Sequence, residues 1–222
     1  KMAQQYQHLP SQVSLGHIKG LICADLKQYE ESFKYNNAAL KLGRQIDYQI
    51  DSILNTLGNI HTLLKDYTNA TYRYEEALTY AKEKKDTIHQ INALYNLGNT
   101  LNNSNQYEAA FDYYQQSLAL QRAKKFFEKE ITTIRHIAWL YLEKIDMNRG
   151  IATFQEGIAL AEKRKDWKSL VTFYRYLGLG YQKKGLQDKS LGAYQQELYI
   201  RENFEKDLGQ ILATKARIAL LD

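Results

Sequence analysis

Hydrophobic residues recur along the chain at the spacing of amphipathic helices, in stripes separated by short polar breaks. One pair of neighbouring stripes contains Leu94, Leu97 and Leu101, followed by Ala110, Tyr114 and Leu118. Apolar residues three and four positions apart share one face of an α-helix. The break between these stripes, SNQYE, consists of turn-forming and helix-starting residues. The pattern therefore predicts two helices joined by a turn.

The same two-stripe pattern returns every forty residues. Segments that start at residues 51, 91, 131 and 171 align without a gap, and an earlier copy that starts at Val13 is two residues shorter. A fixed period of this length is typical of solenoids, in which each unit packs on its neighbours. We expect a single domain over 1–222, with repeats 13–50, 51–90, 91–130, 131–170 and 171–210. Residues 1–12 are expected to end a preceding repeat and residues 211–222 to form the first helix of a further one, so that the fragment is cut inside repeats at both ends.

The breaks between repeats carry helix-starting signals. Asp86 and Asp166 follow the basic breaks KK and KRK and precede the next apolar stripe. An aspartate in this position can accept a hydrogen bond from a free backbone N–H of the first turn, so both residues are expected to be N-caps. Two antiparallel helices in each unit, stacked along the chain, predict an all-α solenoid.

The positions of small and large residues within each unit are specific. The repeat at 51–90 has large residues, a Leu-Gly pair, small residues and an aromatic residue at fixed positions: Leu54, Leu57, Gly58, His61, Ala70, Tyr74 and Ala77. This pattern resembles the tetratricopeptide repeat (TPR) family, and the resemblance covers essentially the whole chain. HEAT repeats share the forty-residue length but not this spacing; the length is similar to that of Pins/LGN-type adaptors and of several bacterial TPR regulators.

The resemblance implies a TPR-type α-solenoid, a right-handed superhelix of stacked antiparallel helix pairs. Three positions depart from the family pattern. Asn36 stands where an aromatic residue belongs, Ala138 replaces the glycine, and Glu197 replaces a small residue. We expect the packing to survive these departures, because small residues still lie where helices approach and large ones fill the space between them.

Asparagine is unusually frequent in the first helix of the repeat at 91–130. Asn92, Asn96, Asn99 and Asn103 fall within a narrow arc of this helix, opposite its leucine stripe. Asn55 and Asn59 add to the same surface in the preceding repeat. The TPR resemblance implies that this arc lines a concave groove, where carboxamides can pair with the N–H and C=O groups of an extended peptide. The alternatives are that the amides bridge adjacent helices or reflect a bias in composition.

The same arc becomes basic toward the C-terminus. One position of the first helix reads Tyr95, Arg135, Arg175 and Lys215 in successive repeats, and Trp139 and Lys183 lie nearby on the same surface. We expect Arg175 to stack on Trp139, since a guanidinium is attracted to an indole face. The interpretation is a bipartite groove, with amides that hold backbone and a cationic pocket for an acidic side chain or terminal carboxylate. The alternative pairs the arginines with local acids such as Glu143 as ordinary surface charges.

Other chemistries find little support in the sequence. No nucleotide loop, catalytic triad or paired-carboxylate arrangement is recognisable, so we expect no enzymatic activity and no cofactor. The five histidines lack metal-ligand spacing, and Cys23 is the only cysteine, which excludes an intrachain disulfide. The net charge of +5 is too low to indicate nucleic acid, and no apolar run is long enough to span a membrane. We expect a cytoplasmic protein.

These observations predict a protein-interaction module that binds a partner protein or peptide in its concave groove. The partner is expected to carry an acidic group or a free carboxylate. An alternative is the sensory or regulatory segment of a larger bacterial-type signalling or transcription-regulating protein. Apolar surface at the ends of the solenoid is also expected to favour a homodimer.

Overall fold

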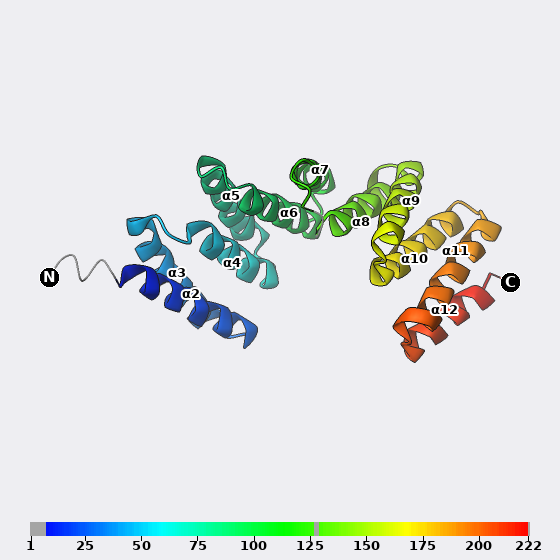
Figure 1. Cartoon of the computed structure of the whole chain (residues 1–222), viewed down its shortest axis with the longest axis horizontal. Coiled ribbons are helices and arrows are strands. Elements are labelled where there is room, and N and C mark those ends of the chain that lie inside the picture. The colour runs from blue at the N-terminus through cyan, green and yellow to red at the C-terminus, as the bar shows by residue number, and fades with distance from the viewer. Residues whose placement is uncertain (1–7, 127–128, 222) are drawn as a thin grey trace. The chain divides into compact units, whose positions relative to one another are not determined.

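A computed structural model describes residues 8–126 and 129–221 of the chain, and all the regular structure in these ranges is helical (Figure 1). The helices are α2 (Leu9–Asp25), α3 (Tyr29–Ile46), α4 (Ile50–Leu63), α5 (Tyr67–Glu83), α6 (Thr87–Asn103), α7 (Tyr107–Ala123), α8 (Glu130–Leu140), α9 (Met147–Arg164), α10 (Trp167–Lys183), α11 (Gln187–Ile200) and α12 (Leu208–Ala219). Two π-helical turns, η1 (Tyr141–Ile145) and η2 (Arg201–Glu205), extend α8 and α11. Of the described helices, none is both long and apolar enough to cross a membrane.

Short turns join the helices into consecutive pairs that stack on one another. The first helices of the pairs are α2, α4, α6, α8 (extended by η1) and α10. The second helices are α3, α5, α7, α9 and α11. The predicted all-α solenoid is therefore confirmed. The pairs fall into two compact units, Lys1–Leu120 (unit 1) and Gln121–Asp222 (unit 2). The division into one domain with the stated repeat boundaries stays a prediction.

A glycine-on-aromatic contact holds the two helices of a pair together. A Cβ added to Gly58 would lie 2.6 Å from the ring of Tyr74, and one added to Gly98 would lie 2.7 Å from the ring of Tyr114. No side chain fits at such distances, so the first helix needs glycine where the second helix brings its tyrosine. This contact explains why Leu-Gly and the later aromatic residue occur together in the repeat.

The departures from the repeat pattern are accommodated by local changes. Asn36 is fully buried, lies against Gly20, and its amide Nδ2 donates to the carbonyl oxygen of Ser32 at 2.9 Å. Glu197 is also fully buried, but its carboxylate accepts from Arg201 at 2.9 Å and from Arg217 at 2.9 Å. A buried carboxylate is tolerated when it is paired and hydrogen-bonded in this way.

The turn inside the pair explains the π-helical turn η1. Lys65, Asn105 and Gly185 occupy equivalent positions and have left-handed backbone, with φ of 60°, 63° and 71°. The equivalent residue in unit 2's first pair is Ile145, whose β-branched side chain disfavours that conformation. The chain instead widens into η1 and reaches Asp146 in an extended conformation with φ of −154°.

Both predicted N-caps are confirmed. The carboxylate of Asp86 accepts a hydrogen bond from the backbone N–H of His89 at 3.1 Å, and that of Asp166 accepts from the N–H of Ser169 at 3.0 Å. Trp167 follows directly and stacks on Phe204, with ring centroids 4.1 Å apart.

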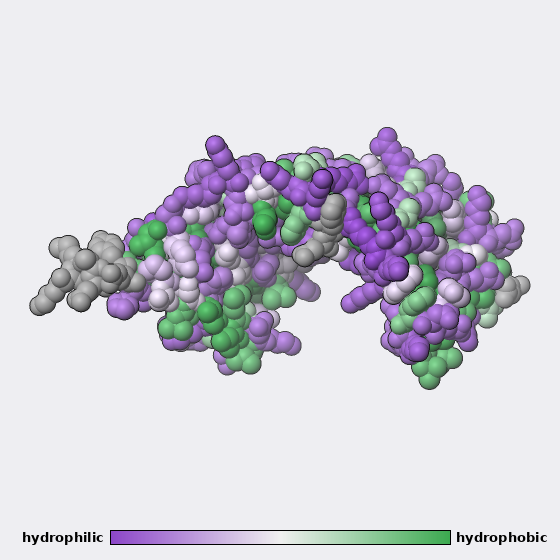
Figure 2. All heavy atoms as spheres, viewed as in Figure 1, coloured by the Kyte–Doolittle hydropathy of each residue, from purple (hydrophilic) through white to green (hydrophobic). Residues whose placement is uncertain are grey.

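The first described helix carries exposed apolar side chains. Leu15, Ile18 and Ile22 of α2 are each more than half exposed. Green spheres of hydrophobic residues gather on the surface at the α2 end of unit 1 (Figure 2). The equivalent residues of α4, Ile53 and Ile60, are buried, because α4 packs beside α2. Apolar surface of this kind was expected at a solenoid end, whereas the homodimer stays a prediction.

Candidate functional site

In unit 1, the predicted asparagines lie on the first helices α4 and α6, which contact each other. We call this surface the amide face; its predicted members are Asn55, Asn59, Asn92, Tyr95, Asn96, Asn99 and Asn103. The structure brings Asn55 and Asn96 together, since the amide Nδ2 of Asn96 donates to the Oδ1 of Asn55 at 3.3 Å. This pair links adjacent helices, so the helix-bridging alternative describes part of the face.

Asn59 and Asn99 are held by a different contact. The hydroxyl of Tyr74 donates to the Oδ1 of Asn59 at 2.6 Å, and the hydroxyl of Tyr114 donates to the Oδ1 of Asn99 at 2.5 Å. Burial raises the pKa of Tyr74 to about 12 and also raises the pKa of Tyr114, so both hydroxyls keep their protons at neutral pH. Each carboxamide therefore has a fixed oxygen. No described residue accepts a hydrogen bond from the Nδ2 of Asn59 or Asn99.

The other members of the amide face lie around these two. Asn55 also donates to the backbone oxygen of Asp51 at 2.9 Å, which ties its side chain to its own helix. The ring of Tyr95 lies 5.9 Å from that of Tyr114, centroid to centroid. Asn92 is half-buried and Asn103 is exposed at the end of α6.

Polar contacts continue between the first helices of unit 1. The Nε2 of His17 on α2 lies 2.9 Å from the hydroxyl of Thr56 on α4, and burial lowers the pKa of this histidine. The hydroxyls of Thr62 on α4 and Thr100 on α6 lie 3.3 Å apart. These contacts fix the spacing of the helices that carry the amide face.

In unit 2, the predicted basic residues divide into two classes. Lys183 pairs with Glu143 at 2.6 Å, and Lys215 pairs with Glu202 at 2.9 Å. Arg135 on α8 and Arg175 on α10 form no salt bridge with any described residue. The charge-pairing alternative therefore holds for the lysines but not for the two arginines, which we call the arginine pair.

The expected stacking of Arg175 on Trp139 is wrong. The guanidinium of Arg175 lies over the ring of Tyr176, 5.2 Å from its centroid, because the neighbouring residue of the same helix is nearer. Trp139 is half-buried on α8. Beside Arg135, burial and then the arginine charge lower the pKa of His136 to about 4, so this imidazole is neutral at pH 7.

One group of side chains in unit 1 has the geometry to hold a metal ion. Ligand atoms of Asp51, Asp86 and His89 lie within 4.8 Å of one another. The Nδ1 of His89 lies 3.0 Å from a carboxylate oxygen of Asp51 and 2.9 Å from one of Asp86, but neither contact has the geometry of a hydrogen bond. The Nε2 lies 3.3 Å from the hydroxyl of Ser52. The carboxylate of Asp86 also caps α6, so the group links the starts of helices α4 and α6.

Comparison with known proteins agrees with this architecture. Residues 49–123 match the family model described as Tetratricopeptide repeat. The apo form of RapI has 17% sequence identity and a TM-score of 0.72, with coverage of 96% of this chain and 80% of that one. The fold is that of tetratricopeptide-repeat proteins. No curated protein matches the chain.

Two further solved structures show the same TPR fold at low identity. BtubC (BKLC) from P. vanneervenii has 15% identity and a TM-score of 0.70, with 96% of this chain and 82% of that chain covered. YrrB has 16% identity and a TM-score of 0.59, with 84% of each chain covered, and is described as a TPR protein with an unusual peptide-binding site.

Tyr74 and Tyr114 were not predicted to be hydrogen-bond partners of the asparagines. A signal was present, because each tyrosine follows its asparagine by fifteen residues in two successive TPR units. In the repeat at 131–170, the residue equivalent to Asn59 and Asn99 is Trp139. The second helix of that repeat carries Phe154, which has no hydroxyl, in place of the tyrosine. Where it is Leu179, the hydroxyl of Tyr194 donates to Gln182 instead, at 3.4 Å.

Proposed function

We propose that unit 1 binds an extended peptide through the amide face, with the Nδ2 groups of Asn59 and Asn99 donating to backbone carbonyl oxygens. The observation that carries the proposal is the fixed orientation of these two side chains. Because a tyrosine hydroxyl occupies each Oδ1, each amide offers donors to a ligand and its own acceptor is already engaged. A rigid donor loses less conformational entropy on binding than a freely rotating one.

The spacing of the two asparagines suits an extended chain. They occupy equivalent positions on adjacent first helices, and packed helices lie roughly 8–10 Å apart. A polyproline-II-like extended chain has three residues per turn and rises about 3.1 Å per residue, so carbonyls three residues apart share one side and would meet the two donors. The face would recognise backbone with little demand on sequence. In the TPR family, this surface belongs to the concave groove.

Unit 2 would add preference for an acidic ligand through the arginine pair. The two guanidiniums have no acidic partner among the described residues, whereas the nearby lysines do. A guanidinium can donate two parallel hydrogen bonds to a carboxylate, from a side chain or from a peptide C-terminus. The description of YrrB as having a peptide-binding site supports a peptide as the class of ligand. The proposed role is recognition without catalysis.

A random-peptide display library tests the proposal. Peptides selected on the wild-type chain would be measured against the variant Asn59→Asp/Asn99→Asp. Aspartate keeps the shape and accepts the tyrosine hydrogen bond, but it replaces the donors by a carboxylate that repels a carbonyl oxygen. We expect affinity to fall by about 3 kcal/mol, roughly a hundredfold.

The matched control is Asn37→Asp/Gln195→Glu, which adds the same two charges at exposed positions of second helices. It should bind the selected peptides like the wild type. Equal affinity of the Asn59/Asn99 variant and the control would contradict the proposal, and so would failure of the wild type to enrich any peptide.

A further inference from the structure

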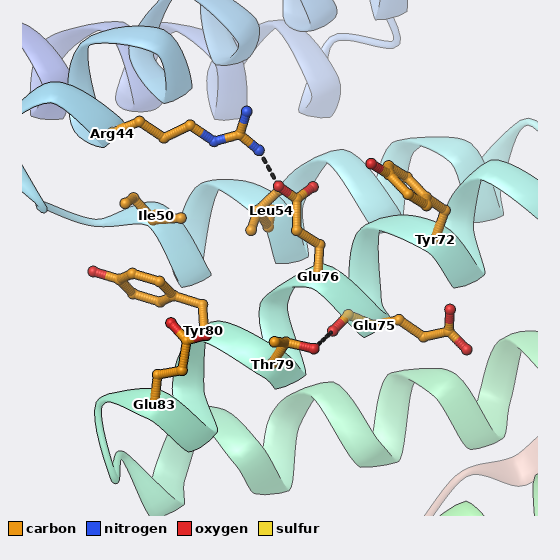
Figure 3. A pocket seen from close by; sticks show the side chains of 9 residues that line it. All are labelled: Arg44, Ile50, Leu54, Tyr72, Glu75, Glu76, Thr79, Tyr80 and Glu83. Atoms are coloured by element: carbon orange, nitrogen blue, oxygen red, sulfur yellow. Dashed lines mark hydrogen bonds and ion pairs between the residues drawn. The ribbon is translucent and has the colours of Figure 1, made fainter.

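A cavity lies on unit 1, and none of its lining residues belongs to the amide face. Its volume is about 440 Å³, and it is formed by the C-terminal part of α3, the start of α4 and the outer side of α5. Figure 3 shows its lining: Arg44, Ile50, Leu54, Tyr72, Glu75, Glu76, Thr79, Tyr80 and Glu83. The volume is in the range of roughly 300–1,000 Å³ in which proteins bind small groups.

The cavity combines an apolar floor with acidic ends. Ile50 and Leu54 of α4 form the floor, and both are buried. Tyr72 and Glu75 lie toward one end, Tyr80 and Glu83 toward the other (Figure 3). Tyr72 is 59% exposed, and the guanidinium of Arg73 lies over its ring, 5.4 Å from the centroid.

The chain's own cations leave two carboxylates unneutralised. Arg44 crosses the cavity to pair with Glu76, which also pairs with Arg73 at 3.3 Å. Lys84 pairs with Asp47 outside the cavity. Glu75 accepts a hydrogen bond from the hydroxyl of Tyr113, which carries no charge. Neither Glu75 nor Glu83 has a salt bridge to any residue in 8–126 or 129–221.

The other repeats show that these residues are not needed for packing. The residues equivalent to Glu75 are amides in every other repeat: Asn37, Gln115, Gln155 and Gln195. The residues equivalent to Glu83 are Gln45, Ala123, Lys163 and Asn203, and those equivalent to Tyr72 are Lys34, Asp112, Ala152 and Gly192. The repeat at 51–90 therefore carries two carboxylates without a salt bridge and an exposed tyrosine, at three positions where the other repeats have other residue types.

We infer that this cavity binds an arginine or lysine side chain of a partner protein, with its aliphatic stem on Ile50 and Leu54 and its charged end at Glu75 or Glu83. Arg44 illustrates the mode within the chain, because its guanidinium already meets a carboxylate above the same floor. Long basic side chains bury their stems on apolar surface while the charge stays at a polar rim. Charge complementarity favours a basic segment, although the chain itself has a net charge of +5.

The test is an NMR titration of the isotope-labelled 222-residue chain with acetyl-Gly-Arg-Gly-amide. We expect saturable shifts of backbone amides between Tyr72 and Glu83 and none with the citrulline peptide, which has the same shape without the charge. Glu75→Gln/Glu83→Gln should weaken binding roughly tenfold or more. Gln at the first position is what three other repeats carry, so this variant should fold normally.

Glu108→Gln on α7 is the matched control and should bind the arginine peptide like the wild type. Equal shifts with the citrulline peptide, unchanged binding by the Glu75/Glu83 variant, or shifts confined to other helices would each overturn the inference. The amide face takes no part in this titration, so the outcome is independent of the proposed peptide site.

Discussion

The amide face of unit 1 and the arginine pair of unit 2 lie on equivalent helices but differ in how their polar side chains are held. On the amide face, neutral tyrosine hydroxyls fix the asparagine oxygens at 2.6 and 2.5 Å and thereby orient the donors. In the arginine pair, the lysines nearby are neutralised and the two guanidiniums are not. In the proposed function, binding at the amide face depends on the fixed orientation of the asparagine donors, and binding at the arginine pair depends on its uncompensated charge. The first should therefore tolerate salt, and the second should weaken with it.

The largest expected effect comes from reversing the charge of the arginine pair. Arg135→Glu/Arg175→Glu should lower the affinity for an alternating Ala/Glu peptide with a free C-terminus by about 4 kcal/mol, roughly a thousandfold. The physical reason is the loss of two charge-assisted contacts and the repulsion that replaces them. Fluorescence anisotropy at low salt measures this.

Lys183→Glu/Lys215→Glu changes the charge by the same amount and is the matched control. Because both lysines are already paired, we expect only about a tenfold loss. Equal losses in the two double variants would show that net charge, rather than the arginine pair, attracts the peptide.

The next effect concerns His136, the buried histidine beside Arg135 in unit 2. Burial lowers the pKa of His136 from 6.5 to about 4, so the folded state resists protonation that the unfolded chain accepts. Stability is therefore present above pH 6.5 and is lost as the pH falls toward 4, by up to about 3 kcal/mol. His136→Asn should remove most of this pH dependence in urea unfolding of the whole chain. A wild-type pH profile retained in the variant would contradict the assignment to this residue.

A smaller effect tests the orienting role of the tyrosines. Tyr74→Phe/Tyr114→Phe removes the hydroxyls that fix Asn59 and Asn99, and it should weaken selected peptides roughly tenfold through lost preorganisation. Tyr194→Phe is the matched control, since that hydroxyl contacts Gln182 and no asparagine. Isothermal titration calorimetry compares the three proteins. An equal loss of affinity in the Tyr74/Tyr114 variant and in the Tyr194 variant would contradict the orienting role of the two hydroxyls.

The smallest effect concerns the turns that space the helices. Lys65 has a left-handed backbone with φ of 60°. The equivalent residue in unit 2, Gly185, is also left-handed, with φ of 71°. Lys65→Gly should stabilise the chain by up to about 1 kcal/mol, and Gly185→Ala should destabilise it by a similar amount. Urea unfolding midpoints measure both. A loss of stability in the first variant would contradict the account of the turn.

Much of the fold was predictable because it depends on local spacing. Leu-Gly followed by an aromatic residue predicts the close contact that Gly58 makes with Tyr74, and aspartates before apolar stripes predict the caps at Asp86 and Asp166. The widening at Ile145 was not predicted. It arises because β-branched Ile145 stands at a position where other repeats have a left-handed backbone, and a helical period does not show this.

The candidate site was predictable as a surface but not as a set of contacts. Helical geometry places Asn59, Asn99, Arg135 and Arg175 on first helices, yet it does not say which side chain takes up each hydrogen bond. The stacking of Arg175 on Trp139 failed because Tyr176, next in sequence, was closer. The cavity lined by α3, α4 and α5 was not predicted, because a helical period does not show which surface side chains enclose a hollow.

The central claim is that Asn59 and Asn99 donate to a bound peptide, and their side-chain amide signals report this directly. In an isotope-labelled chain, both Nδ2 groups should shift and exchange more slowly with solvent when a display-selected peptide is added. The signals of Asn37, exposed on α3, should stay unchanged. A peptide that binds while the Nδ2 signals of Asn59 and Asn99 keep their positions and exchange rates would contradict the account.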